Sequence, residues 1–212
     1  TCDVMIENNS VDLIDKLGIG WDELHERNPN LILIRMPSVG LSGPYRSYLG
    51  FGVNFEALCG LGAIRGYPDA DLSENDGVYH MDAASGSAGA LAALMALRRR
   101  EKTGVGELVE LSQCENMLNH IGELLVHASQ TNTVHGPLGN RHRKYAPQGC
   151  YETQGDDQWV VISVTNDDQW GQLCTLMDAD DMANDGSMKD AIGRQAKHEV
   201  IDERIRKWTE SK

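Results

Sequence analysis

One apolar run decides the fold class: Leu31-Ile32-Leu33-Ile34-Arg35-Met36, at residues 31–36. Its length and its β-branched residues are typical of a buried strand. A second short run of this kind, Asp3-Val4-Met5-Ile6, precedes it, and the sequence between the two carries helix signals. Strand, helical crossover and strand form the unit of a parallel sheet with a right-handed connection. The sequence therefore predicts an α/β fold that contains the end of a Rossmann-like parallel-sheet domain.

Two short helices are expected between these strands. Ser10 can cap the first, which ends at Gly18, and the second covers 21–27. After the second strand, residues 37–50 are rich in Gly, Ser, Pro and Tyr and predict a loop. Loops at the carboxyl ends of parallel strands are where ligands usually bind, so this loop is a candidate binding segment.

The rest of the chain predicts long helices and then a small α+β domain. We expect helices over 51–61, from Val78 to about Glu101, and over 112–131, 167–177, 188–197 and 198–210, a strand over 107–111, and a hairpin of 149–153 with 159–164. The core of the long helix, residues 83–90, has almost no side-chain volume, so another backbone or a ligand must approach it closely. We therefore predict three parts. Residues 1–60 are the end of the α/β domain, residues 61–131 are a loop with long helices, and residues 132–212 are the small domain.

Composition excludes several classes of protein. The chain has 212 residues, with 41% hydrophobic and 24% charged residues, which is typical of a globular protein and not of a disordered or fibrous one. Its 19 Lys and Arg face 32 Asp and Glu, and this excess of negative charge disfavours nucleic acid as a partner. No apolar stretch is long enough to span a membrane. The five scattered cysteines predict neither disulfides nor zinc and favour a cytoplasmic location.

Asp82 is the first candidate for chemistry, because it lies in the first turn of the long helix. The usual role of an aspartate there is to cap the helix. The small residues around it, however, leave room for a substrate, and a carboxylate can act as a nucleophile. His80, Ser85 and Ser87 lie nearby, but no G-x-S-x-G turn supports a Ser-His-Asp hydrolase.

Other motifs are weaker. Gly60 to Gly66 nearly matches a dinucleotide-binding fingerprint but has no preceding strand, so a helix stop and turn is favoured. Arg141-His142-Arg143-Lys144 is the densest basic cluster and can hold phosphates. Arg98 to Arg100 lie where cations complement the end of a helix. No histidine or carboxylate pattern has metal-ligand spacing, so no metal is expected.

Taken together, these segments resemble the family III CoA-transferases, also called the CaiB/BaiF family, which includes α-methylacyl-CoA racemase. The matching motifs, in chain order, are 2–8, 17–18, 28–32, 40–45, Asp82, 89–94, 102–106, 139–141 and 159–162. The resemblance covers the chain up to about Asp178. It implies that 1–60 belongs to a CoA-binding domain. Family members are considerably longer, and two chains interlock, so the resemblance implies a homodimer and a chain that is a fragment, whose own activity can be impaired.

The resemblance also implies the chemistry. Asp82 is the expected nucleophile: its carboxylate attacks an acyl-CoA thioester, and CoA then passes through an aspartyl thioester to an acceptor carboxylic acid. Coenzyme A is therefore the expected substrate group, with no metal, and a small carboxylic acid is the expected acceptor. Residues expected to contact CoA are Asn8, Asn9, Ser10, Lys16, Arg35, Phe51, Arg143, Lys144 and Tyr145.

Two departures from the family bear on substrate and reaction. Residues 143–145 match the position of a glycine-rich lid in formyl-CoA transferases but contain no glycine, which disfavours formyl-CoA. Racemases of the family place a His where Phe51 stands and a Glu near Gly149, and this chain has neither. An acyl-CoA racemase or epimerase therefore ranks below the transferase. A third alternative, from another class, is a truncated non-catalytic remnant that acts in assembly.

Overall fold

The computed structural model of the chain describes residues 2–71, 73 and 79–212. Its contacts divide the chain into two units, which we call unit 1 (residues 1–65 and 70–136) and unit 2 (residues 66–69 and 137–212). The predicted segment 1–60 and most of the predicted segment 61–131 lie in unit 1, because the long helix packs on the sheet, whereas residues 66–69 belong to unit 2. Val78, the predicted first residue of that helix, lies outside the described residues.

The described part of unit 1 is built on a parallel sheet in the order β1-β2-β3. Its strands are β1 (Val4–Glu7), β2 (Ile32–Arg35) and β3 (Leu108–Glu110). All residues of β2 are buried, as expected for a central strand of a parallel sheet. The register pairs Ile34 with Ile6 on one side and with Val109 on the other. The predicted α/β class and parallel sheet are confirmed.

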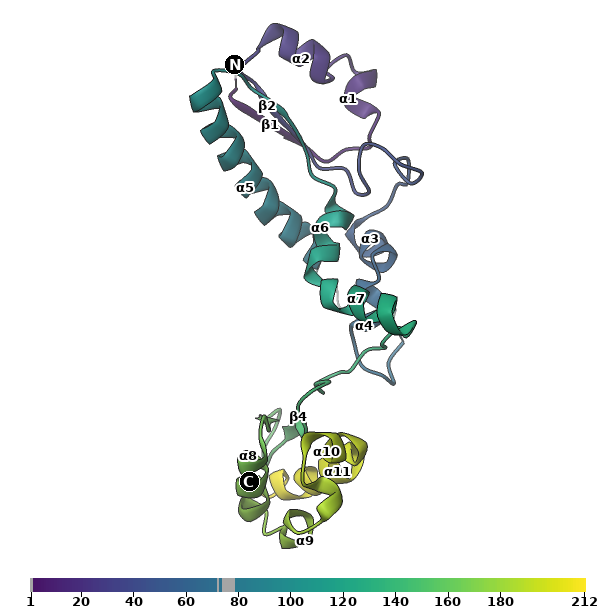
Figure 1. The fold of residues 1–212 in the computed structure, drawn as a ribbon, viewed down its shortest axis with the longest axis vertical. Coiled ribbons are helices and arrows are strands. Elements are labelled where there is room, and N and C mark those ends of the chain that lie inside the picture. Colours follow the sequence, from purple (N-terminus) through teal and green to yellow (C-terminus); the bar gives the residue numbers. More distant parts are fainter. Residues whose placement is uncertain (1, 72, 74–78) are drawn as a thin grey trace. The chain divides into compact units, whose positions relative to one another are not determined.

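Helices lie on both sides of this sheet and beyond it. The helices in the described part of unit 1 are α1 (Leu13–Lys16), α2 (Trp21–Arg27), α3 (Gly52–Leu58), α4 (Leu61–Ile64), α5 (His80–Thr103), α6 (Gln113–His120) and α7 (Gly122–Thr131). α5 lies along one side of the strands, with α1 and α2 on the other (Figure 1). A Cβ added at Gly89 would lie 3.0 Å from Met36 Sδ, so the close neighbour of the small-residue helix at this position is the side chain that follows β2, where the sequence predicted a backbone or a ligand.

Three details of unit 1 differ from the prediction. The helix expected over 51–61 ends at Leu58 and restarts at Leu61, because Gly60 adopts a left-handed conformation with φ of 89°. The helix expected over 112–131 is broken at Ile121, whose φ of −114° and ψ of 17° leave the helical region. Ser10 contributes its backbone carbonyl, not its side chain, to the start of α1, accepting from the Leu13 N–H at 2.9 Å.

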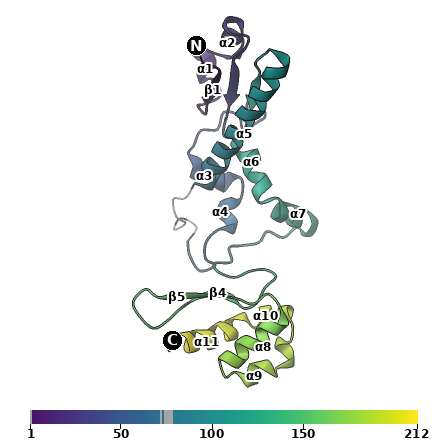
Figure 2. The same ribbon diagram turned by 90° about the vertical axis from the view of Figure 1, so that its left-hand side faces the viewer.

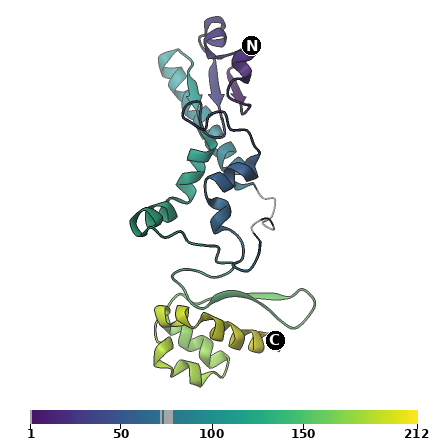
Figure 3. The same ribbon diagram turned by 90° about the vertical axis from the view of Figure 1, so that its right-hand side faces the viewer.

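Unit 2 packs an antiparallel hairpin against short helices. The hairpin is β4 (Gln148–Glu152) with β5 (Trp159–Ser163), and the helices are α8 (Asp167–Leu176), α9 (Asp180–Ala183), the 3₁₀ helix η2 (Gly186–Met188), α10 (Ala191–Ala196) and α11 (His198–Thr209). The hairpin lies along one side of the helices (Figures 2 and 3). Tyr151, Trp170 and Ile205 are among the residues of the buried core between them. α9 was not expected, because a single turn has too few residues to show a period.

Candidate active site

Asp82 lies in the first turn of α5, and its side chain is exposed. Within residues 2–71, 73 and 79–212, no hydrogen bond or ion pair involves its carboxylate. The capping role that is usual for an aspartate at a helix start is therefore not seen among these residues. Among the described residues, no donor occupies either carboxylate oxygen.

Gly52, at the start of α3, lies directly against this carboxylate. A Cβ added at residue 52 would lie 3.0 Å from each of the two Asp82 oxygens, closer than nearly all such contacts. The missing side chain therefore keeps the space in front of Asp82 open. Phe51 is the residue before Gly52, and it is 82% exposed. The structure thus places one predicted site residue, Asp82, against Gly52, the residue that follows another, Phe51.

A buried carboxylate that the sequence analysis missed holds the start of α5. Glu56 of α3 is only 5% exposed, and its Oε1 accepts a hydrogen bond from the Met81 backbone N–H at 2.8 Å. Its Oε2 lies 3.3 Å from Arg65 Nη1. The signal for Glu56 was its helical spacing with Phe55 and Cys59, which places a charge on the buried face of a short helix.

The loop that follows β1 forms a separate hollow in unit 1. Asn8, Asn9 and Ser10 are exposed there and line a space of about 80 Å³ together with residues of the 37–50 loop. β1 and β2 are parallel neighbours, so their carboxyl ends bring these two loops to one edge of the sheet. The two predicted binding segments therefore lie side by side.

Arg35 differs from the expectation of a direct ligand contact. Its guanidinium is buried, with Nε 2.6 Å from Glu7 Oε1 and Nη2 donating to the Val11 carbonyl at 2.5 Å. The other oxygen of Glu7 accepts from the Asn9 N–H at 3.0 Å. Arg35 therefore acts through Glu7 to fix the loop after β1, because its donors are already directed at protein atoms.

Two cations lie around a second hollow beside this loop. Lys16, Arg46 and Ser10 are among the residues that line a space of about 160 Å³. Arg46 pairs with Asp12 at 2.5 Å, in an ion pair that is half exposed on both sides. Lys16 was predicted, whereas Arg46 was missed, although its place as the basic residue of the predicted 37–50 loop was a usable signal.

The predicted basic segment of unit 2 forms a tightly held turn. His142 Nδ1 accepts from the backbone N–H groups of Lys144 and Tyr145, and its ring stacks on that of Tyr145. The Gln195 side chain donates to the carbonyls of His142 and Tyr145. Arg143 and Lys144 are exposed, and within the described part of the chain neither forms an ion pair. Two cations are thus presented on a fixed backbone.

Arg141, the first residue of the same basic cluster, is used inside unit 2. Its two terminal nitrogens lie 2.9 Å from Glu199 and 2.7 Å from Asp202, and the bond to Glu199 raises the pKa of the guanidinium. Asp202 also accepts from the Tyr151 hydroxyl at 2.7 Å, and burial raises the pKa of that hydroxyl. These groups line a hollow of about 410 Å³. Because the carboxylates that line this hollow balance the charge of its arginines, it does not favour an anionic ligand.

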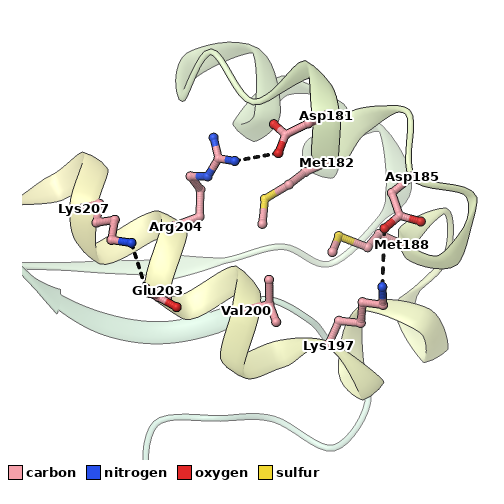
Figure 4. Close-up of a pocket in the computed structure, with 9 residues that line it drawn as sticks. All are labelled: Asp181, Met182, Asp185, Met188, Lys197, Val200, Glu203, Arg204 and Lys207. Atoms are coloured by element: carbon pink, nitrogen blue, oxygen red, sulfur yellow. Dashed lines mark hydrogen bonds and ion pairs between the residues drawn. The ribbon is translucent and has the colours of Figure 1, made fainter.

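A second hollow of unit 2, of about 320 Å³, is lined by ion pairs and by Met182 and Met188 (Figure 4). Arg204 pairs with Asp181 at 2.6 Å, and Lys207 pairs with Glu203 at 2.7 Å. Lys197 and Asp185 form a third pair at 3.5 Å. Since each cation already has a carboxylate, this hollow offers little to a charged ligand.

The comparison with known families decides the membership of the chain. The sequence model of CoA-transferase family III matches residues 1–212. The chain belongs to CoA-transferase family III. The resemblance found in the sequence is thereby confirmed at the level of the family.

Relatives of the family III chain carry transferase names. It is 32% identical over 98% of its length to succinyl-CoA–D-citramalate CoA-transferase of Chloroflexus aurantiacus, covering 51% of that protein. It is 30% identical over 99% of its length to the beta subunit of succinyl-CoA–L-malate CoA-transferase of the same organism, covering 52% of it. The crystal structure of a CAIB/BAIF family protein from Brucella suis matches 99% of the chain with a TM-score of 0.86 and 25% identity, over 55% of that chain.

The chain spans about half the length of the curated relatives it matches. Within the described residues, no group of three or more His, Cys, Asp or Glu side chains could hold a metal ion. None of the helices in the described part of the chain is both long and apolar enough to cross a membrane.

Proposed function

We propose that the chain carries the nucleophile of an acyl-CoA:carboxylate CoA-transferase, and that Asp82 is that nucleophile. The enzyme would move CoA from an acyl-CoA donor to a carboxylic acid acceptor. One observation carries the proposal: the Asp82 carboxylate is exposed, lies beside Gly52, and has no partner among the described residues. A thioester carbonyl can approach such a carboxylate without first displacing a protein donor.

The proposed transfer proceeds through covalent adducts of Asp82. An Asp82 oxygen bonds to the thioester carbonyl carbon, the C–S bond breaks, and CoA leaves as the thiolate, so that a mixed anhydride of Asp82 and the donor acid remains. The thiolate then attacks the aspartyl carbonyl, which releases the donor acid and gives an aspartyl-CoA thioester. The acceptor carboxylate attacks the aspartyl carbonyl of this thioester, which frees the thiolate again and gives a mixed anhydride of Asp82 and the acceptor acid. Attack of the thiolate on the acceptor acyl carbon then yields the new acyl-CoA and restores Asp82.

The loops at the carboxyl ends of β1 and β2 are the proposed CoA contacts. Asn8, Asn9 and Ser10 offer exposed polar groups at one hollow, and Lys16 and Arg46 border the next. In a chain with a net charge of −13, such local cations are needed to bind the phosphates of CoA. Arg143 and Lys144 of unit 2 are proposed as further contacts because their cations are exposed on a hydrogen-bonded turn, and Tyr145 of the same turn is proposed with them.

The names of the relatives guide the choice of substrates. Two of them are named for succinyl-CoA, with D-citramalate and L-malate as partners. We therefore propose succinyl-CoA as the first donor to test and a small hydroxy-dicarboxylic acid as the first acceptor. Departure from the glycine-rich lid pattern at residues 143–145 supports a donor other than formyl-CoA.

A cytoplasmic homodimer is the proposed setting. All five cysteines are free thiols in the structure, which fits a reducing compartment. Leu91, Leu94 and Met95 form an exposed apolar face on α5, each at least 59% exposed, which a second chain would cover. Mass photometry of the purified protein tests the dimer, and a monomer at micromolar concentration would contradict it.

The decisive experiment traps the adduct. The purified protein is incubated with succinyl-CoA and then with hydroxylamine, which converts an activated aspartyl carbonyl into a hydroxamate. Peptide mass spectrometry should locate the modification at Asp82, and Asp82→Ala should abolish it while the fold stays nearly unchanged. A modification at another residue, or an Asp82→Ala protein that still transfers CoA, would overturn the assignment.

The same incubation in D₂O separates the alternatives. Deuterium at the α-carbon of the recovered acyl-CoA, without an adduct at Asp82, would indicate a racemase or epimerase. Neither exchange nor adduct would indicate a non-catalytic chain that serves in assembly.

A further inference from the structure

The backbone N–H of Met81, the residue before Asp82, is bonded to α3, whereas the N–H of Ala83, the residue after it, is bonded to the Tyr79 carbonyl at the start of α5. The backbone N–H groups of the first turn of a helix have no intrahelical acceptor. In α5 the N-cap residue Tyr79 makes no side-chain cap bond, and the Met81 N–H donates instead to Glu56 Oε1 at 2.8 Å. A residue of a neighbouring helix thus performs the capping.

Burial makes this bond strong and specific. Glu56 is 5% exposed and Met81 is 1% exposed, and Met81 packs in a core cluster with Phe55 and Cys59 of the α3 region. A buried carboxylate is costly unless its oxygens are paired, and here one oxygen takes the Met81 N–H and the other faces Arg65. Residue 81 is therefore fixed both by its backbone and by its side chain.

The same helix also shapes the space in front of Asp82. Gly52 and Glu56 are four residues apart, so they lie on one face of α3. Gly52 leaves room at the two carboxylate oxygens of Asp82, and Glu56 holds the residue immediately before it. One short helix therefore determines both where Asp82 lies and how much space it has.

We infer that Glu56 is a positioning residue for the nucleophile, an inference that rests on the proposed function of Asp82. Glu56 takes no part in bond making. It fixes the first turn of α5, so that the Asp82 carboxylate meets the thioester carbonyl at the reactive distance and angle. Small errors in such placement are costly: a displacement of about 1 Å can slow a reaction by about 100-fold.

The test compares two replacements of Glu56. The maximal rate of adduct formation at Asp82 and the half-saturating concentration of succinyl-CoA are measured for wild type, Glu56→Gln and Glu56→Ala. Glu56→Ala should lower the maximal rate by about 10- to 100-fold, with the half-saturating concentration within about twofold of wild type, because the proposed CoA contacts lie on other loops. Glu56→Gln keeps an oxygen for the Met81 N–H and should recover most of the rate.

Ile32→Ala is the matched control for lost stability. Ile32 is fully buried in unit 1, at the amino end of β2, and its truncation lowers the melting temperature without touching α3. Below its melting transition this variant should form the adduct at close to the wild-type rate. The inference is overturned if Glu56→Ala reacts at the wild-type rate, or if Glu56→Gln or Ile32→Ala slows as much as Glu56→Ala. Wild type without any adduct at Asp82 overturns the proposed function, and this inference with it.

Discussion

Asp82 in unit 1 and Asp202 in unit 2 are the same residue type in opposite surroundings. Asp202 is 4% exposed and is held by the Tyr151 hydroxyl at 2.7 Å, by Arg141 at 2.7 Å and by His198 at 3.6 Å. Asp82 is exposed and has no partner among the described residues. One carboxylate is committed to its own fold, and the other is free to meet a ligand.

The contrast teaches how a structural carboxylate differs from a reactive one. A buried carboxylate needs several donors to offset its lost hydration, and those donors then occupy the lone pairs that a reaction would use. An exposed carboxylate keeps its lone pairs but contributes little to folding. Mutations at the two positions should therefore separate activity from stability.

The largest expected effect is on activity at Asp82. Asp82→Asn keeps the size of the side chain but removes the negative oxygen, so adduct formation should fall by about 1,000-fold or more. The free energy of unfolding should change by no more than about 0.5 kcal/mol, as for an exposed residue without partners. Stopped-flow release of CoA and urea denaturation measure the two quantities.

Asp202→Asn in the same two assays is the control. It should form the adduct at a rate within about threefold of wild type per folded molecule, because no step of the proposed transfer uses Asp202. Equal loss of rate in both variants would mean that the two carboxylates do not differ in role, and the comparison would fail.

The next largest effect is on stability at Asp202. Asp202→Ala leaves the buried Tyr151 hydroxyl without its acceptor and should cost about 3 kcal/mol of unfolding free energy, at the low end for a broken buried pair because Arg141 keeps Glu199. Glu199→Ala removes the exposed partner of the same Arg141 and should cost much less, because solvent screens an exposed ion pair. A cost for Glu199→Ala equal to that for Asp202→Ala would contradict the role of burial.

Gly52→Ala should give a smaller effect on activity with no loss of stability. The added Cβ would lie 3.0 Å from both Asp82 oxygens, so adduct formation should slow by about tenfold through crowding. Alanine is favoured over glycine in a helix, by up to about 1 kcal/mol, so the protein should not be destabilised. Quench-flow kinetics measures the rate of adduct formation, and thermal unfolding measures the stability.

Gly62→Ala is the matched replacement for Gly52→Ala. A Cβ at residue 62 would make only ordinary contact, 3.5 Å from the Ala57 Cα, and no part of the proposed reaction lies there. Its adduct rate should equal that of wild type. If Gly52→Ala is as fast as Gly62→Ala, the space at residue 52 does not matter to the nucleophile.

The sequence predicted the parts of unit 1 that depend on local patterns. The run 31–36 predicted a buried strand because its apolar residues are continuous, and the small residues 83–90 predicted a close neighbour, which is Met36. Asp82 could be placed in the first turn of a helix because the pattern that marks the start of this helix is also local. Periodicity and residue volume act over a few residues and can be read directly.

Partners far apart in the sequence could not be predicted in this way. Glu56 meets the Met81 N–H across 25 residues, and Arg35 meets Glu7 across 28. Before the fold is known, a charged residue in either place is equally compatible with a ligand contact, which is the role that the sequence analysis expects for Arg35. The structure shows that Glu7 and the Val11 carbonyl take its donors, because β1 and β2 are neighbours in the sheet.

The smallest expected effect is a pH dependence of unit 2 that arises beside Asp202. His198 is 3% exposed and its Nε2 accepts from the Gln148 N–H at 3.2 Å, which requires that nitrogen to be unprotonated. Burial lowers the pKa of His198 from its ordinary 6.5, an effect that Arg141 reinforces and that Asp202 and Glu199 oppose. Since the unfolded state then binds protons at higher pH than the folded state, stability is present above about pH 6.5 and is lost as the pH falls through the lowered value.

Urea midpoints between about pH 7 and 5.5 measure this slope. They are read from tryptophan fluorescence in a Trp21→Phe background, in which the remaining tryptophans, Trp159, Trp170 and Trp208, all lie in unit 2. His198→Gln removes the titrating group and should flatten it, whereas His120→Gln, at an exposed position in unit 1, should leave it unchanged. A wild type that becomes more stable as the pH falls would mean that attraction to Asp202 outweighs burial at His198. In that case protonated His198 would be a charged partner of Asp202 in acid. Asp202 would then be held more firmly at low pH, and its surroundings would differ still more from those of Asp82.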